Sequence, residues 1–183
     1  MTVERSFGFP PVARADARVL ILGSLPGQAS LAAQQYYAQR YNAFWPVMGR
    51  LFSAGPDHDY LERLRRLTRS GIALWDVCAS AKRPGSLDHK IDASSVTPND
   101  FGSFFDAHRR IGLIFFNGAA AERLYLSLVI PTLAPSAARI ETKRLPSTSP
   151  AHANLSLEKK LAAWEEVRRA TASLLADPPS RSL

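Results

Sequence analysis

The chain has 183 residues, the length of one ordinary domain, and 46% of them are hydrophobic, which excludes a chain that is disordered by composition. Its single cysteine, Cys78, excludes an internal disulfide and a four-cysteine iron–sulfur cluster. The formal net charge of +7 at pH 7 favours a polyanionic partner such as nucleic acid.

In chain order, the pattern predicts a strand at 18–23, helices at 28–40, 44–52 and 59–70, a strand at 72–77, a polar loop at 78–91, a helix at 97–108, a strand at 111–117, a helix at 119–128, a strand at 139–147 and a helix at 156–176. The strands are short apolar runs such as "RVLILG", typical of a buried parallel sheet. In the helix at 97–108, Thr97 is expected to be the N-cap and Pro98 the first helical residue.

The ends of the chain and its apolar runs bear on location and domain organisation. Residues 1–17 carry charges and lack the apolar segment of a secretory signal, and no run of about 18 apolar residues occurs, so a cytoplasmic protein without a membrane span is expected. No motif calls for a metal ion or a cofactor. We expect a monomer with one domain over residues 1–183, a core over about 16–176, and frayed ends that include residues 177–183.

Alternating strands and helices predict an α/β fold, a three-layer αβα sandwich around a central, mainly parallel four-stranded sheet. Ligands of such sheets bind beyond the carboxyl ends of the strands. Four polar or glycine-rich strand exits are therefore expected to meet there, namely 23–27, 76–80, 117–118 and 146–152.

Two of these exits are small turns that precede helices. "GSLPG" at 23–27 is neither a Walker loop, a GxGxxG loop nor a GxSxG nucleophile elbow, and it predicts a rigid turn that exposes backbone amides over a cleft. "LPSTSPAH" at 145–152 offers the hydroxyls of Ser147, Thr148 and Ser149 to phosphate oxygens, and Lys143 and Arg144 add positive charge.

Taken together, the motifs resemble a known family. "GSLPGQASLAAQQYYAQRYNAFWPVMG", followed by "LWDV", "FFNG" and "LPSTSPAHA", is similar to the uracil-DNA glycosylase superfamily, and most similar to its DNA-deoxyinosine (hypoxanthine-DNA) glycosylase branch. The resemblance runs from about Arg18 to Val167. It implies a monofunctional base-excision repair enzyme that flips a deaminated base, hypoxanthine or uracil, out of DNA and hydrolyses its N-glycosidic bond.

The resemblance also implies catalytic roles. In several branches the residue that holds the attacking water lies in the first turn as an asparagine or an acid, but here those positions are Ser24 and Leu25, and neither suits a base. The deoxyinosine branch points to Asn42 of "NAFW" instead. An amide can orient water but cannot take its proton, so leaving-group stabilisation must supply much of the rate. Asp76 is expected to read the base edge or to help with the water.

The other expected site residues fall into two groups. For the base pocket, Phe44 is expected to stack on the extruded base and Asn117 to pair with its lactam edge, together with Gly23, Ser24, Leu25, Trp75 and Ser80. The residues expected to bind DNA that contains deaminated bases are Pro26, Gly27, Ser147, Thr148 and Ser149 of the two turns. A basic loop with Lys82, Arg83, His89 and Lys90 is expected to face the DNA as well. His152 is expected to enter the gap left by the flipped base.

Two other functions stay open at this point. A domain that kept the turns but lost catalysis would bind damaged DNA without releasing a base. A small-molecule hydrolase would use Ser24 or Ser149 with His152, but it would also need an acid that orients the histidine and an oxyanion hole, and the sequence offers no accepted pattern for them.

Overall fold

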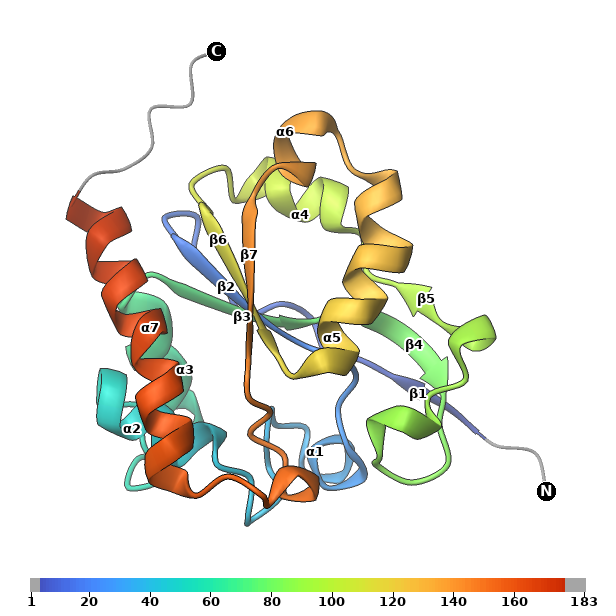
Figure 1. Ribbon diagram of the computed structural model, residues 1–183, viewed down its shortest axis with the longest axis horizontal. Coiled ribbons are helices and arrows are strands. Elements are labelled where there is room, and N and C mark those ends of the chain that lie inside the picture. The colour runs from blue at the N-terminus through green and yellow to red at the C-terminus, as the bar shows by residue number, and fades with distance from the viewer. Residues whose placement is uncertain (1–3, 177–183) are drawn as a thin grey trace.

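A parallel sheet lies at the centre of the molecule. A computed structural model describes residues 4–176, so the expected fraying of 177–183 falls outside the described residues. Four strands form the sheet in the order β3-β2-β6-β7 and all neighbours run parallel. Their bounds are Val19–Gly23 (β2), Ile72–Asp76 (β3), Leu113–Asn117 (β6) and Glu141–Leu145 (β7). The predicted three-layer αβα fold is confirmed (Figure 1).

Helices cover both faces of this sheet, which explains why β2, β3 and β6 are buried along their whole length. Successive side chains of a strand point to opposite faces. Leu20 and Leu22 therefore belong to one core cluster, whereas Val19 and Ile21 belong to the other. The helical segments are Gln28–Ala33 (α1), Phe44–Phe52 (α2), Tyr60–Arg69 (α3), Phe101–Ala107 (α4), Ala119–Leu124 (α5), Pro135–Ala138 (α6) and Leu157–Ala176 (α7).

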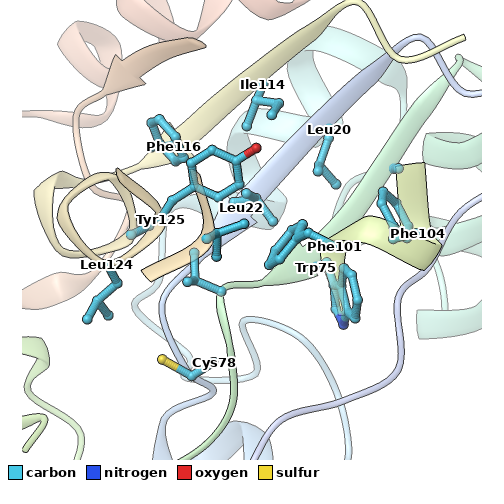
Figure 2. Packing of buried hydrophobic residues seen from close by; sticks show 14 of the residues in the cluster. Leu20, Leu22, Trp75, Cys78, Phe101, Phe104, Ile114, Phe116, Leu124 and Tyr125 are labelled. Carbon is cyan, nitrogen blue, oxygen red and sulfur yellow. The ribbon is translucent and has the colours of Figure 1, made fainter. Parts of the chain in front are cut away.

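Aromatic rings dominate the core under α4 and α5. Trp75 on β3 packs on Phe101 and Phe104 of α4, with a ring-centroid separation of 4.9 Å in each pair. Phe116 on β6 lies 5.3 Å from Tyr125, again between ring centroids, where α5 continues into a π-helical turn over Tyr125–Val129 (Figure 2). The opposite core gathers Phe44, Trp45 and Trp164 between the sheet and helices α2, α3 and α7.

A second, antiparallel sheet was not predicted. Arg5–Phe7 (β1), Cys78–Lys82 (β4) and Thr97–Pro98 (β5) pair in the order β1-β4-β5. The prediction of a polar loop from residue 78 is therefore wrong for its first five residues. The ordered fold also begins before residue 16, since β1 and a bridge between Val12 and Leu74 tie the N-terminal segment to both sheets.

Two predicted helices differ from the structure. The helix expected at 28–40 ends at Ala33, because Gln34 and then Tyr37 adopt left-handed backbone conformations, with φ of 52° and 55°. The helix expected at 97–108 begins only at Phe101, and its N-cap is Asp100 instead of the expected Thr97. The Asp100 carboxylate accepts a hydrogen bond from the Ser103 backbone N–H. Within residues 4–176, no helix combines the length and the apolar character that a membrane crossing requires.

Candidate active site

A pocket of about 680 Å³ opens at the carboxyl ends of the parallel strands. The exits of β2, β3, β6 and β7 all contribute to its wall, as the strand-exit rule predicts. The pocket-lining residues that the sequence also singled out are Gly23, Ser24, Leu25, Pro26, Gly27, Asn42, Asp76, His89, Asn117, Ser147, Thr148, Ser149 and His152. The structure thus brings four segments distant in sequence to one cavity.

Asp76 lies at the floor of the pocket, where β3 ends beside β2. Gly23 is its partner in the sheet register, and a Cβ on Gly23 would lie 2.3 Å from Asp76 Oδ1 and 3.1 Å from the Tyr37 hydroxyl. Only glycine leaves room here for the two side chains to approach each other. Asp76 Oδ2 is buried and has no hydrogen-bond partner within residues 4–176.

The electrostatics of this floor are unusual for a carboxyl group. Burial raises the pKa of Asp76 to about 7, the Asp88 carboxylate adds to the rise, and the Arg83 guanidinium opposes it. Burial also raises the pKa of Tyr37, whose hydroxyl lies next to Asp76 and Asn117. Near neutral pH, Asp76 is therefore able to accept or to donate a proton, whereas Tyr37 stays protonated.

Asn117, at the end of β6, holds the last turn in place. Its Oδ1 accepts from the Thr148 backbone N–H at 2.9 Å, and its Nδ2 donates to Thr148 Oγ1 at 2.8 Å. The next residue, Gly118, has a φ of 96°, and a Cβ there would lie 3.0 Å from the Ser147 Cβ. The exits of β6 and β7 are thus locked together at this point.

Asn42 joins the pocket from the segment before α2. Its Oδ1 accepts from the Phe44 backbone N–H at 2.9 Å, which is the local turn that asparagine favours. The next residue, Ala43, donates its backbone N–H to the carbonyl oxygen of Thr148 at 2.9 Å. The "NAFW" segment therefore lies against the last turn, so that residues of the first and last motifs share one wall.

Two tyrosine rings, Tyr36 and Tyr37, line the pocket, and the expected Phe44 is not among the lining residues. Tyr36 is only 3% exposed and its hydroxyl donates to the Pro10 carbonyl, so the partly exposed Tyr37 is the ring that faces the cavity. Phe44 is fully buried, and the ring of Tyr37 stacks on it at 4.0 Å with an interplanar angle of 24°. Tyr37 lines the pocket, whereas Phe44 does not. The predicted stacking role of Phe44 is therefore wrong, because Phe44 is the support behind Tyr37. Trp75 was also wrongly assigned to the pocket, since it is 6% exposed and packs in the core against α4.

Three predicted polar contacts lie elsewhere. Ser80 is on β4, outside the pocket wall, and accepts a hydrogen bond from Arg5. Lys82 is exposed at the end of the same strand and does not line the pocket. Arg83 was expected to face DNA, but its side chain is 1% exposed and binds the carbonyl oxygens of Leu25 and Pro26.

The last turn also departs from expectation. Thr148 is fully buried, so its hydroxyl is an anchor for Asn117 instead of a phosphate ligand. Lys143 and Arg144 are paired with the carboxylates of Glu166 and Glu122. Ser147 and Ser149 remain at the pocket wall, and each hydroxyl oxygen accepts a backbone N–H, from Ser149 and Ala151 respectively.

Sequence reasoning missed Asp88. Its carboxylate accepts from the Ser24 hydroxyl at 2.6 Å and lies 3.8 Å from Arg83 Nη1. Ser24 is therefore bonded to a carboxylate instead of a histidine, and this geometry gives no support to a serine hydrolase. The proline and glycine at 84–85 signalled a turn, but nothing in the sequence showed that this loop folds back onto the first turn. Within residues 4–176, no group of three or more potential ligands could hold a metal ion.

The fold and this pocket define an α/β protein whose polar cleft lies at the carboxyl edge of a parallel sheet. The family model described as the uracil DNA glycosylase superfamily matches residues 10–168. The match covers most of the chain, and the chain belongs to this superfamily.

Two curated proteins show what the chain is similar to. A protein from Methanosarcina acetivorans named "Hypoxanthine DNA glycosylase" is 36% identical over 163 residues, which cover 88% of this chain and 97% of that protein. A protein of the same name from Methanosarcina barkeri is 36% identical over 160 residues, or 87% and 95% of the two chains. The solution NMR structure of a candidate uracil DNA glycosylase from Methanosarcina acetivorans superposes with a TM-score of 0.75 at 34% identity, covering 92% of this chain and 99% of that one.

Proposed function

We propose that this protein is a monofunctional DNA glycosylase that hydrolyses the N-glycosidic bond of hypoxanthine or uracil flipped out of DNA. The observation that carries the proposal is one pocket that combines the buried carboxyl group of Asp76, the amides of Asn42 and Asn117 and the partly exposed ring of Tyr37 beside a hydroxyl-rich turn. Its volume of about 680 Å³ lies in the range typical of small-ligand sites. The relatives named as hypoxanthine DNA glycosylases support this substrate class.

The flipped base stacks on Tyr37. The Tyr37 ring is held from behind by Phe44, so it presents a fixed face to the cavity. Stacking on an aromatic ring accepts any base, so selection has to come from hydrogen bonds to the base edge. Asn117 lies beside the Tyr37 hydroxyl, and its amide supplies both a donor and an acceptor for the lactam edge that hypoxanthine and uracil share.

Cleavage passes through a sugar with oxocarbenium character, so the enzyme has to position a water molecule and stabilise the departing base. We assign the orientation of the water to Asn42, whose amide is fixed by its bond to the Phe44 backbone. Asp76 supplies the proton acceptor that an amide lacks, since burial brings its pKa to about 7. No lysine of the described chain lines the pocket, which agrees with hydrolysis without strand cleavage.

The two turns hold the DNA backbone. Ser147 and Ser149 use their oxygens to accept backbone N–H groups, which leaves both hydroxyl hydrogens for phosphate oxygens. Pro26 and Gly27 face the same pocket from the first turn, and His152 fills the gap in the duplex. We also propose that the protein acts as a monomer, since one chain supplies every group named above, and that it works in the cytoplasm.

The direct test uses oligonucleotides that carry a single inosine, uracil, xanthine or ethenocytosine. We expect release of hypoxanthine or uracil, with strand breaks only after alkali treatment. Binding without release of any base would overturn the proposal and favour a damage-binding protein of the same fold. Strand breaks without alkali would contradict the monofunctional assignment.

The role of Asn42 has its own test. Asn42→Ala should lower single-turnover excision by about 100-fold, because misplacing a reacting group by about 1 Å costs this much, while DNA affinity is retained. Asn42→Ser is the matched variant, since a serine oxygen still accepts from the Phe44 backbone N–H. Comparable loss in both variants supports a role in chemistry, whereas full activity of either variant contradicts it.

A further inference from the structure

We propose that the loop from Arg83 to Lys90 is a second DNA-contacting lip of the pocket, and that its Leu87 side chain enters the base stack beside the flipped nucleotide. The inference rests on the proposed glycosylase function and deepens it.

The loop is anchored to the first turn from both of its ends. At its start, Arg83 Nη1 donates to the Leu25 carbonyl at 3.0 Å, and Arg83 Nε donates to the Gly85 carbonyl at 3.1 Å. At its far end, Asp88 accepts from the Ser24 hydroxyl at 2.6 Å. Because the guanidinium is buried and bonded to backbone carbonyls, the loop and the "GSLPG" turn form one unit.

The middle of the loop is anchored as well. Ser86 Oγ accepts from the Gln28 backbone N–H at 2.9 Å, at the first residue of α1. A Cβ on Gly27 would lie 3.4 Å from the same oxygen, so the loop packs directly on the turn. The residues on both sides of Leu87 are therefore anchored, so the loop can hold its position when the Leu87 side chain contacts a duplex.

The position of Leu87 suits contact with DNA. Ser86, Leu87, Asp88 and His89 all line the pocket, and Leu87 is 38% exposed. The loop follows β4 in the chain and packs on the turn after β2. In the sheet, β6 with Asn117 lies between β2 and β7, and β7 leads into the first lip, Ser147–His152. The two lips thus lie on opposite sides of the pocket floor, and Figure 1 shows both at the same end of the molecule.

The chemistry of the loop fits a wedge. A single exposed leucine on a protein surface needs no explanation by itself. This one, however, lies at the edge of the pocket on a loop anchored by Arg83, Ser86 and Asp88, next to the exposed His89 and Lys90. Apolar side chains such as leucine are the usual wedges between base steps, and they offset the few kcal/mol lost when a base leaves the stack.

The test compares duplex with single-stranded substrate. Leu87→Ala should lower single-turnover excision of hypoxanthine from a duplex by about tenfold, because a wedge compensates for the lost stacking. Excision from the same strand without its complement should change by less than about twofold, since little stacking has to be broken there. Leu87→Met should restore most of the duplex rate, and Leu61→Ala, at a leucine that is 67% exposed on α3, is the matched control.

Base flipping can also be followed without chemistry. With 2-aminopurine next to the inosine, wild-type protein should raise the fluorescence on binding to the duplex, and Leu87→Ala should raise it less. Equal loss of activity on duplex and single strand would overturn the proposal and make Leu87 a wall of the base pocket. Unchanged duplex activity would overturn it as well. The proposed function fails separately, if wild-type protein releases no base from either the duplex or the single strand.

Discussion

Asn117 and Thr148 are joined by two hydrogen bonds that tie the end of β6 to the turn after β7. These two bonds fix the orientation of the Asn117 amide, so it presents one fixed arrangement of donor and acceptor to the pocket. The same turn accepts the backbone N–H of Ala43, so three strand or helix ends converge on Thr148. Thr148 therefore acts on the geometry of the base pocket, whereas Ser147 and Ser149 on either side of it line the pocket wall.

Replacing Thr148 tests this anchor. Thr148→Val keeps the shape of the side chain but leaves the buried Asn117 Nδ2 without its acceptor, which typically costs about 1–3 kcal/mol. We expect a loss of that size in the free energy of unfolding, measured by urea denaturation, together with weaker binding of inosine-containing DNA. Thr142→Val on β7 is the control. Wild-type stability and binding in Thr148→Val would contradict the anchor role.

Tyr37 should respond differently to removal of its ring and of its hydroxyl. Tyr37→Phe keeps the stacking surface and should retain most of the affinity for damaged DNA. Tyr37→Ala removes it and should weaken binding by about 10- to 100-fold, the usual worth of one base–aromatic contact. Fluorescence anisotropy with an uncleavable substrate analogue measures both.

The control for this pair is Phe44→Leu. Phe44 lies behind Tyr37 and is fully buried, so its replacement should lower stability, and it should affect binding less than Tyr37→Ala does. If Phe44→Leu weakened binding more than Tyr37→Ala did, the assignment of the stacking ring would be wrong.

The sheet was predictable because its strands are short apolar runs that end at glycine or polar residues. β4 escaped prediction because "CASAK" contains no β-branched or aromatic residue. The helix predicted at 28–40 was too long because hydrophobic pattern and propensity do not reveal the left-handed conformations at Gln34 and Tyr37.

The location of the candidate site could be predicted from the order of strands and helices alone. Strand exits of a parallel sheet converge whatever their side chains, so the four segments were found together. Which ring faces the cavity depends on the backbone turn at Tyr37, where φ is 55°, and this turn places Phe44 behind it. Arg83 was predicted to bind DNA because it lies in a basic, polar stretch of sequence. Its bonds to carbonyl oxygens of the first turn join residues that are distant in sequence, so they could not be predicted.

Arg123 is expected to contribute to DNA binding through charge alone. It is exposed on α5 and lines the pocket, whereas Arg144 nearby is already paired with Glu122. Arg123→Gln should weaken binding to all DNA sequences alike and reduce the slope of log K against log salt by about 1. Arg69→Gln, an exposed arginine on α3, should leave the slope unchanged. An unchanged slope in Arg123→Gln would remove this residue from the interface.

The pH dependence of excision tests the role of Asp76. As a proton acceptor it has to be ionised, so the single-turnover rate should rise with pH and level off above its pKa of about 7. Asp76→Asn should lower the plateau and abolish that step in the profile. A rate that falls as pH rises through 7 would instead assign the protonated carboxyl group as the working form, and the proposed role as acceptor would be wrong.

The same carboxyl group links stability to pH with a defined sign. Its pKa is raised on folding from 3.8 to about 7, so the folded state binds the proton more tightly than the unfolded chain. The contribution of Asp76 to the free energy of unfolding is therefore largest at low pH, and it falls as the pH rises from about 4 to 7. Between pH 5 and 8 wild-type protein should lose about 3 kcal/mol through Asp76, and Asp76→Asn should not lose this part. Urea unfolding of both proteins at the two pH values measures the difference, and parallel losses would show that the carboxyl group titrates normally.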